Sequence, residues 1–278
     1  MTQELPTTPR WRCLLHPRWW LTALLLAVCA WPCWRGFAYL AAVSEVKAYA
    51  SWSTIGPFDL RLTGLGPPGS EATRREDYRR LVLFKGRDLK SIGHLLPRLR
   101  PTILEAEECM AVDLDALKGL TSLRDITFRS CPALQNVDGI KGLTGLRMLY
   151  LFNCTALQNV DALKGLTGLQ TLKIEGCASL RNVDVLKGLT SLQGLTLINC
   201  STLQNVDALR GLTGLRYLAL IRCHALQNVD VIKGLTGLER LELIGCTELS
   251  TSDLRDIRAA QPDAVIFFPD GTWNTPPP

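Results

Sequence analysis

The chain has 278 residues, of which 47% are hydrophobic and 21% are charged, and its formal net charge is +5. Residues 1–100 carry 15 basic against 7 acidic side chains (net +8) and residues 101–278 carry 16 against 19 (net −3), so the basic excess belongs to the first part alone. With three histidines and no Gly-x-Ser-x-Gly, His-Glu-x-x-His or phosphate-loop motif, the sequence offers no catalytic constellation, and an enzyme is the weaker hypothesis.

An uncharged apolar run covers residues 19–34 and follows three arginines between residues 10 and 18. Sixteen helical residues span about 24 Å, short of the roughly 30 Å hydrocarbon core, so a crossing helix would continue past Pro32 and Arg35. Tryptophans border the run at both ends, as in an interfacial aromatic belt. We therefore expect a transmembrane signal-anchor over residues 19–43, preceded by a cytoplasmic basic tail over residues 1–18.

The arginines before the apolar run outnumber the charges just after it, which predicts a cytoplasmic N-terminus and an extracytoplasmic position for the rest of the chain. A signal peptide that is cleaved or lipidated is the main alternative, and cleavage would make the protein secreted. Ten cysteines, if largely reduced, are uncommon outside the cytoplasm and conflict with this localisation.

Residues 44–70 predict a linker, because they end in the turn-rich run Gly-Leu-Gly-Pro-Pro-Gly at residues 64–69. Residues 71–100 are basic and contain a strand-like segment at residues 81–84 and a helical segment from about Asp88 to Leu96. We interpret residues 71–100 as an N-terminal cap with solvated basic side chains. Binding of this cap to lipid headgroups or to an acidic partner is the alternative.

Internal repeats dominate the remainder of the chain. Apolar residues precede each of six cysteines at fixed distances and give the pattern Leu-x-x-Leu-x-Leu-x-x-Cys. A fixed period of this length indicates a solenoid, because one coil cannot bury its own leucines and must stack on others. The six cysteines stand 23 residues apart: Cys131, Cys154, Cys177, Cys200, Cys223 and Cys246.

This pattern resembles the leucine-rich repeat family, and its spacing is similar to the short, internalin-like class of bacterial repeats with one residue added after the cysteine. The resemblance implies an α/β solenoid, a horseshoe or arc with a parallel β-sheet on its concave face. Apolar residues then recur at every third position after the first five cysteines, which suits short 3₁₀ turns on the convex face. The fold class is therefore this solenoid plus one N-terminal transmembrane helix.

We assign the repeats to residues 101–250, with Cys109 beginning a degraded copy. Residues 251–268 predict a C-terminal cap, in which Ser252 caps a helix that reaches Ala260 and residues 264–268 form a last strand. Residues 269–278 end in three prolines and predict a disordered tail.

Within each coil, the sequence Asn-Val-Asp-x-Leu-Lys-Gly has a local interpretation. We expect Asp161 to cap a single helical turn and Gly165 to end it in the left-handed conformation, with the same roles in the other copies. The basic residue before this glycine recurs in every copy and forms a column beside the aspartates. A solvated structural face explains this column better than a polyanion-binding stripe does. Its members are Lys141, Lys164, Lys187, Arg210 and Lys233.

The six cysteines predict a buried, reduced thiol ladder with a structural role. Parallel strands keep neighbouring Cβ atoms roughly 4.8 Å apart, beyond the usual ~3.8 Å of a disulfide. Free cysteine behaves as a small hydrophobe, and the chain has no Cys-x-x-Cys pair. Metal, redox or disulfide roles remain the alternatives.

A binding surface is expected where the copies differ, because the shared residues are needed to build the coil. The outward strand positions lie two, four and six residues before each cysteine, and several are apolar or aromatic. Strand propensity, or cover by the cap or linker, would also explain them. The candidate partner-binding residues on the concave face are Met148, Tyr150, Phe152, Lys173, Glu175, Ile198, Tyr217, Ile221, Arg240 and Ile244.

The sequence as a whole predicts a membrane-tethered scaffold that binds another protein, or a glycan, on its concave sheet. We expect no catalytic residue, cofactor, metal, nucleic acid or small-molecule substrate. Two other hypotheses remain: a cell-envelope spacer that self-associates, and a cytoplasmic regulatory subunit similar to leucine-rich-repeat phosphatase regulators.

Overall fold

The computed structural model describes residues 61–63, 80–84, 89–109 and 113–274, and in them eleven strands form one sheet in chain order. The helices are α2 (Leu89–Ile92), α3 (Leu96–Leu99) and α4 (Thr251–Ala260). The 3₁₀ helices are η3 (Leu114–Leu117), η4 (Asp138–Ile140), η5 (Asp161–Leu163), η6 (Asp184–Gly188), η7 (Asp207–Leu209) and η8 (Asp230–Gly234). The strands are β1 (Arg61–Thr63), β2 (Arg80–Phe84), β3 (Ile103–Glu107), β4 (Asp125–Arg129), β5 (Met148–Phe152), β6 (Thr171–Glu175), β7 (Gly194–Ile198), β8 (Tyr217–Ile221), β9 (Arg240–Glu242), β10 (Val265–Phe267) and β11 (Trp273–Asn274).

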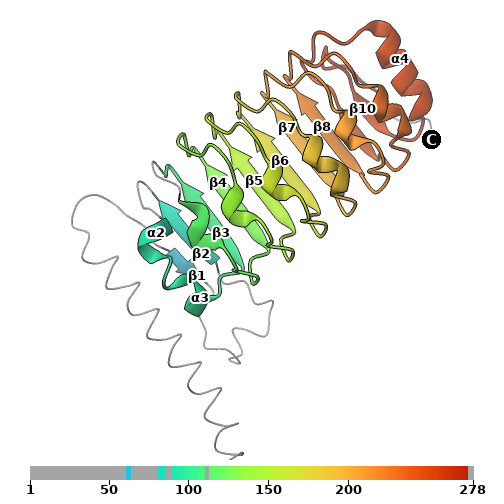
Figure 1. Cartoon of the computed structure of the whole chain (residues 1–278). Coiled ribbons are helices and arrows are strands. Elements are labelled where there is room, and N and C mark those ends of the chain that lie inside the picture. The colour runs from blue at the N-terminus through green and yellow to red at the C-terminus, as the bar shows by residue number, and fades with distance from the viewer. Residues whose placement is uncertain (1–60, 64–79, 85–88, 110–112, 275–278) are drawn as a thin grey trace, which may run out of the picture.

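The coils stack along one long axis, with the strands side by side on one side and the 3₁₀ helices on the other (Figure 1). Equivalent residues pair in register, so Leu149 lies between Ile126 and Leu172 of the neighbouring coils. Strands β2 to β10 run parallel, as the repeat predicts, because each coil returns in the same direction to the same edge. The predicted solenoid with a parallel sheet and short 3₁₀ turns is confirmed.

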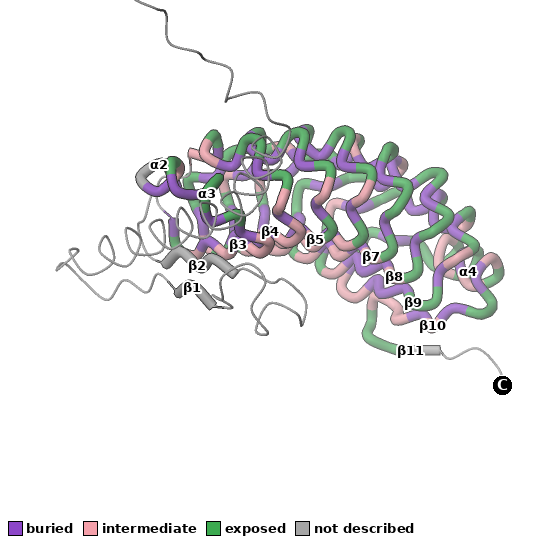
Figure 2. Tube along the Cα trace, turned by 90° about the horizontal axis from the view of Figure 1, so that it is seen from below, coloured by how far each residue is buried: buried purple, intermediate pink, exposed green. Residues whose placement is uncertain are grey.

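The core is a continuous row of apolar side chains between the sheet and the turns. Inward strand residues such as Leu149 and Leu151 are fully buried, and so is Leu163 of η5. Figure 2 shows buried and exposed segments alternating around each coil. The period of three after the first five cysteines therefore marks the core-facing residues of successive tight turns, of which the third residue, such as Leu163, lies in a 3₁₀ helix.

The residue before each cysteine has a left-handed backbone, with φ between 50° and 71° in the seven described coils. Its amide continues the hydrogen bonding between coils, as where Asn153 N donates to Glu175 O at 2.7 Å. Glycine and asparagine adopt this conformation most readily, which explains Gly176, Asn153 and Asn199. The sequence interpretation did not recognise this position.

The predicted cap of each turn is wrong in one respect. Asn136 Oδ1, and not the Asp138 side chain, accepts the hydrogen bond from the first helical amide, Asp138 N, at 3.0 Å. An aspartate at the first helical position has its own amide to be satisfied, and the residue two places earlier has the reach to do so. The same contact recurs at Asn159, Asn205 and Asn228, and Asp113 makes it in the degraded coil.

The left-handed glycine is present in only some of the coils. Lys164 (φ −55°, ψ 121°) and Gly165 (φ 87°) have the backbone angles of a type II turn, which requires glycine at its second central position. In η6 and η8 the 3₁₀ helix instead runs on through Gly188 and Gly234, whose φ angles are not positive. The expectation is therefore wrong for these two glycines.

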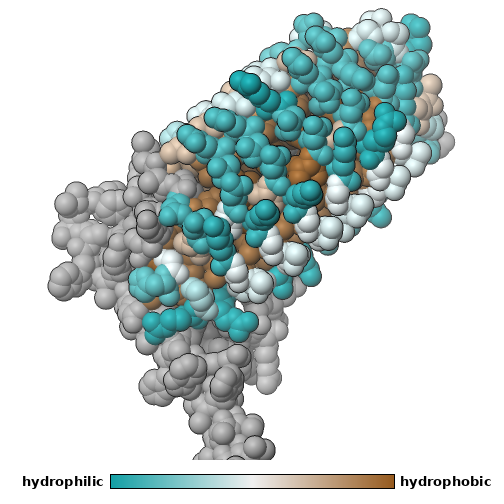
Figure 3. Space-filling view, viewed as in Figure 1, coloured by the Kyte–Doolittle hydropathy of each residue, from teal (hydrophilic) through white to brown (hydrophobic). Residues whose placement is uncertain are grey.

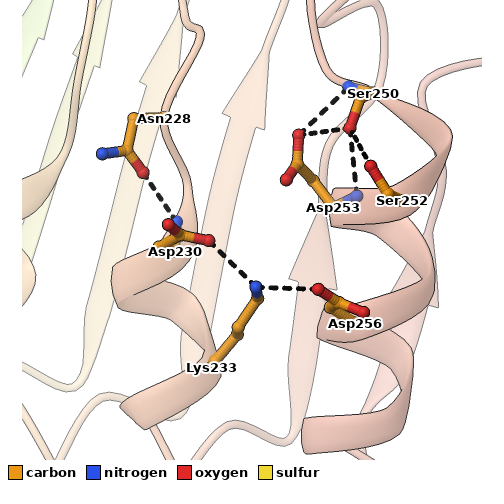
Figure 4. Close-up of polar contacts among 7 residues, drawn as sticks. All are labelled: Asn228, Asp230, Lys233, Ser250, Ser252, Asp253 and Asp256. Carbon is orange, nitrogen blue, oxygen red and sulfur yellow. Dashed lines mark hydrogen bonds and ion pairs between the residues drawn. The ribbon is translucent and has the colours of Figure 1, made fainter.

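The C-terminal end of the core is covered by α4 and β10. Ser250, and not Ser252 as predicted, is the N-cap, and it forms a capping box with Asp253 (Figure 4). Buried Gln261 ends the helix, and its Nε2 donates to Ile232 O at 2.8 Å and to Leu235 O at 3.1 Å. Each of these two carbonyl oxygens also accepts a backbone hydrogen bond, from Leu235 N and from Leu238 N, so the buried Gln261 amide is a second donor that ties the cap to the last turn.

The segments outside the repeats differ in detail from the prediction. The predicted helix from Asp88 is two short helices, α2 and α3, separated at Gly93. Strand β1 lies within the predicted linker and β11 within the predicted disordered tail, and both pair antiparallel with the end strands of the parallel array. None of the helices in the described ranges is long and apolar enough to span a bilayer. The proposed anchor, residues 19–43, lies outside these ranges.

Replacing Asn136 with alanine should destabilise the coil, because the Asp138 amide would lose its acceptor. We expect a cost of about 0.5–2 kcal/mol in the free energy of unfolding, measured by urea denaturation. Asp138→Asn is the control and should cost less, since the Asp138 side chain caps nothing. Equal losses in the two variants would contradict this assignment.

Candidate functional site

The outward residues of β4 to β9 form one surface, which we call the sheet face. All ten candidate binding residues lie on it, although Ile244 follows the end of β9 instead of lying within it. Nine of these side chains are half-buried and Arg240 is exposed. Their positions agree with the expected alternation of a strand, while their role in binding stays a prediction.

Strand β5 carries large side chains at all three outward positions, Met148, Tyr150 and Phe152. The two rings lie 6.0 Å apart at an interplanar angle of 43°, a tilted arrangement typical of aromatic pairs. Tyr150 Oη lies 3.4 Å from Met148 Sδ. The three side chains therefore form a ridge along one strand.

Two cations flank the Phe152 ring from the neighbouring strands. Arg129 Cζ lies 4.4 Å from the ring centroid and Lys173 Nζ lies 4.9 Å from it. Lys173 also pairs with Glu175 at 3.1 Å. Arg129 was not among the predicted site residues, because only the in-register pairing of β4 with β5 brings it to this ring.

A second cluster lies at the C-terminal side of the sheet face. Arg240 Nη2 and Nε both contact Glu242 Oε1 at 2.6 Å, and the guanidinium lies 4.7 Å from the Phe267 centroid and 6.0 Å from that of Tyr217. The Glu242 carboxylate is nearly buried, with a side chain 9% exposed. Glu242 and Phe267 were not among the predicted site residues: Glu242 is an outward residue of β9, and Phe267 lies in the strand predicted for the C-terminal cap.

Small side chains separate the two clusters. Thr171 and Gly194 lie in register between Met148 on β5 and Tyr217 on β8, and Thr196 lies between Lys173 on β6 and Ala219 on β8. We call Thr171, Gly194 and Thr196 the low strip. Their exposure is intermediate, so solvent reaches them. These three small side chains thus separate the two clusters on one part of β6 and β7, whereas Lys173, Glu175 and Ile198 are the larger outward residues of the same two strands.

The electrostatic environment keeps both tyrosine hydroxyls protonated. Burial, followed by the nearby Asp125 charge, raises the pKa of Tyr150. Burial, followed by the Glu242 carboxylate, raises the pKa of Tyr217. Burial also raises the pKa of Asp125 against the effect of Arg147 and Arg124. These hydroxyls are therefore hydrogen-bonding groups and not candidate bases.

The thiol ladder lies on the inner side of the coil, where the seven described cysteines are buried and free. Cys131 Sγ lies 3.3 Å from Arg129 O and Cys246 Sγ lies 3.2 Å from Leu220 O, so the thiols point at backbone carbonyls. Contact with the Cys200 thiol, together with burial, raises the pKa of Cys223 to about 12. Contacts with neighbouring thiols and burial also raise the pKa of Cys154. Contacts with neighbouring thiols lower the pKa of Cys131 and of Cys177 in the same ladder. Burial of the sulfur atoms, which all seven described cysteines share, is therefore what opposes nucleophilic or metal-binding chemistry.

The basic column is ion-paired at Lys233, its last member, and at Lys118, the equivalent residue of the degraded coil, which extends the column by one position. Lys118 pairs with Asp115 at 2.8 Å, and Lys233 pairs with Asp230 at 2.9 Å and with Asp256 of α4 at 3.1 Å (Figure 4). Figure 3 shows hydrophilic side chains spread along the solenoid with hydrophobic atoms visible between them. These contacts agree with a solvated structural face. Within the described ranges, the four basic residues between the ends make no ion pair: Lys141, Lys164, Lys187 and Arg210.

The described residues contain no group of three or more histidine, cysteine or acidic side chains placed to hold a metal ion. His224 is exposed, whereas its neighbour Cys223 is fully buried, so this pair is not arranged for nucleophilic catalysis. What the sheet face offers instead is aromatic surface, oriented guanidinium groups and hydroxyls, which suit recognition.

Residues 121–250 match the family model described as BspA type leucine rich repeat region, in six copies. This segment is therefore a leucine-rich repeat region, and the resemblance seen in the sequence is confirmed. No curated protein sequence matches the chain.

Among solved structures, the leucine-rich repeat domain of the type III effector XopL is 21% identical with a TM-score of 0.55, over 67% of this chain and 75% of that one. Internalin C2 from Listeria monocytogenes is 24% identical with a TM-score of 0.43, over 58% and 79%. The functional domain of InlJ from Listeria monocytogenes, described as including a cysteine ladder, is 16% identical with a TM-score of 0.34, over 54% and 27%. The likeness to the XopL domain concerns the fold alone.

The buried thiols should resist alkylation as long as the coils remain stacked. At pH 8.5 we expect iodoacetamide to leave Cys223 unmodified in the native protein and to modify it in urea, because burial limits access and the raised pKa suppresses the thiolate. Mass spectrometry of the alkylated peptides identifies which cysteine reacts. Rapid native labelling of Cys223 would place the ladder in contact with solvent and contradict the structure.

Proposed function

We propose that this leucine-rich repeat protein binds another protein through its sheet face and acts without catalysis. The single observation that carries the proposal is the accessibility of the β5 ridge: Met148, Tyr150 and Phe152 stand half-exposed at three successive outward positions of one strand. Aromatic side chains bordered by charge are typical of the energetically dominant part of protein interfaces.

The positions of the terminal helices support this proposal. Helix α2 packs against η3 and α4 packs against η8, so both lie on the turn side of the solenoid. Cover by these two helices therefore does not explain the apolar residues of the sheet face. Strand propensity alone also fails to explain why Phe152 is flanked by two cations that neighbouring strands provide.

A second part of the proposal concerns location. We propose that residues 19–43 anchor the chain in a membrane and that the repeats lie outside the cytoplasm. The support is the sequence alone, namely an apolar run bordered by tryptophans and preceded by arginines. A tethered solenoid would present its sheet face to partners at a fixed surface.

Replacing Tyr150 and Phe152 together with alanine should weaken partner binding about tenfold or more, because truncation of central aromatic residues typically costs over 1 kcal/mol. Thermal stability should change little. The partner is first identified by cross-linking to the full-length chain in its native membrane, and binding is then measured with the purified partner. Leu149→Ala is the control for a structural residue on the same strand: because this side chain is buried, its truncation should lower the free energy of unfolding by about 2–5 kcal/mol.

Unchanged affinity of the Tyr150→Ala, Phe152→Ala variant would move the binding surface elsewhere. Capture of a glycan in place of a protein would change the class of the partner. Concentration-dependent self-association without any captured molecule would favour the spacer hypothesis.

The proposed topology predicts that a C-terminal reporter active only outside the cytoplasm gives signal and that a reporter active only inside gives none. The protein should also stay in the membrane fraction after a high-salt wash. Deletion of residues 19–43 is the control: the reporter active outside the cytoplasm should then give no signal, the one active inside should give signal, and the protein should leave the membrane fraction. A cytoplasmic signal from the intact chain would favour the regulatory-subunit hypothesis.

A further inference from the structure

Two arginine side chains stand at opposite sides of the sheet face, one on β4 and one on β9. The Arg129 guanidinium stacks on Phe152 at 4.4 Å and forms no ion pair within 4.0 Å in the described part of the chain, although Glu107 is its in-register neighbour. Stacking fixes the plane of a guanidinium and leaves the N–H groups at its edge available.

Arg240 is held still more firmly. Nearly buried Glu242 binds its Nε and Nη2 atoms at 2.6 Å, and its Cζ atom lies 4.7 Å from the Phe267 ring centroid and 6.0 Å from that of Tyr217. A guanidinium has five N–H donors, and those of Nη1 make no hydrogen bond with any residue that the structure describes. Its side chain is 51% exposed. An arginine oriented in this way loses little entropy when it binds an anion.

The low strip between these arginines has no structural need for its glycine. Gly194 lies inside β7, its φ is not positive, and an added Cβ would meet no atom closer than Thr171 Cγ2 at 3.8 Å. Glycine inside a strand weakens it, so its presence where alanine would fit is typical of a place that another molecule approaches closely.

We propose that the partner presents an apolar segment flanked by carboxylates, which lies over the low strip while Arg129 and Arg240 bind the carboxylates. This inference rests on the proposed function and specifies its partner. Apolar side chains suit Tyr150, Tyr217 and Ile198, and carboxylates match the planar donor pairs of arginine in geometry and charge. Lys173 contributes less than Arg240: each is already paired with a glutamate, but the Lys173 side chain is 32% exposed and the Arg240 side chain is 51% exposed.

The test is selection of random 20-residue displayed peptides on the purified full-length chain. We expect the enriched peptides to carry Asp or Glu on both sides of aliphatic or aromatic residues. The double variant Arg129→Glu, Arg240→Glu should bind these peptides at least about tenfold more weakly and should select Lys and Arg in their place. Gly194→Phe should block binding by filling the low strip.

A matched control separates specific contacts from net charge. Lys164→Glu with Arg210→Glu makes the same change in charge on the turn side, and it should leave peptide affinity unchanged. Circular dichroism and thermal melting establish that each variant is folded. If the charge-reversed double variant Arg129→Glu, Arg240→Glu (the reversed pair) fails to fold, Arg129→Gln with Arg240→Gln replaces it.

The possible failures are distinguishable. Peptides that bind regardless of Tyr150→Ala and Phe152→Ala would overturn the proposed function as well. Peptides that need both rings but show no acidic preference, or that the turn-side control weakens equally, would overturn only the present inference. Displacement by inorganic phosphate, or binding of phosphatidylglycerol vesicles that is lost in the reversed pair, would also overturn it, because the anion would then not be a protein carboxylate.

Discussion

In-register stacking of identical coils is the constraint on which the remaining structure depends. Each residue lies beside its own copy one coil away, as Leu149 lies beside Leu172, so any recurring side chain must tolerate itself as a neighbour. Leucine side chains can stack on their own copies in the core, and the small cysteine thiols can do so where the chain turns after each strand. Charged residues can do so only where water or an opposite charge is close, as where Lys233 pairs with Asp230 on the exposed turns.

The same constraint divides the surface into two kinds. On the turn side the copies are nearly identical, and Asn136 and its equivalents are used to hold the local backbone. On the sheet face the outward residues differ from strand to strand, so neighbouring strands combine unlike side chains. Phe152 lies between Arg129 and Lys173 for this reason, and Arg240 can have an aromatic ring on each of two flanking strands. Recognition is therefore expected from the face on which no residue is required by the repeat.

A stack of coils also needs its ends covered, because the last coil has no neighbour to receive its carbonyl groups and leucines. Gln261 donates to Ile232 O in η8 and to Leu235 O just after it, and α4 packs against η8. The short antiparallel strands β1 and β11 finish the two edges of the sheet. Ending the array in this way limits edge-to-edge association, which long uncovered parallel edges would favour.

The amino-acid sequence by itself determined the coil, because 23-residue spacing and the apolar pattern admit only stacking with equivalent positions in register. It also placed nine of the ten candidate residues on the correct strand, since side chains alternate in a β-strand, and only Ile244 lies beyond the end of its strand. Tertiary structure alone decided which side chain caps each turn, why residues such as Asn153 precede the cysteines, and which cations reach Phe152 and Tyr217. These facts depend on backbone φ angles and on contacts between residues about one coil apart, and a linear pattern records neither of them.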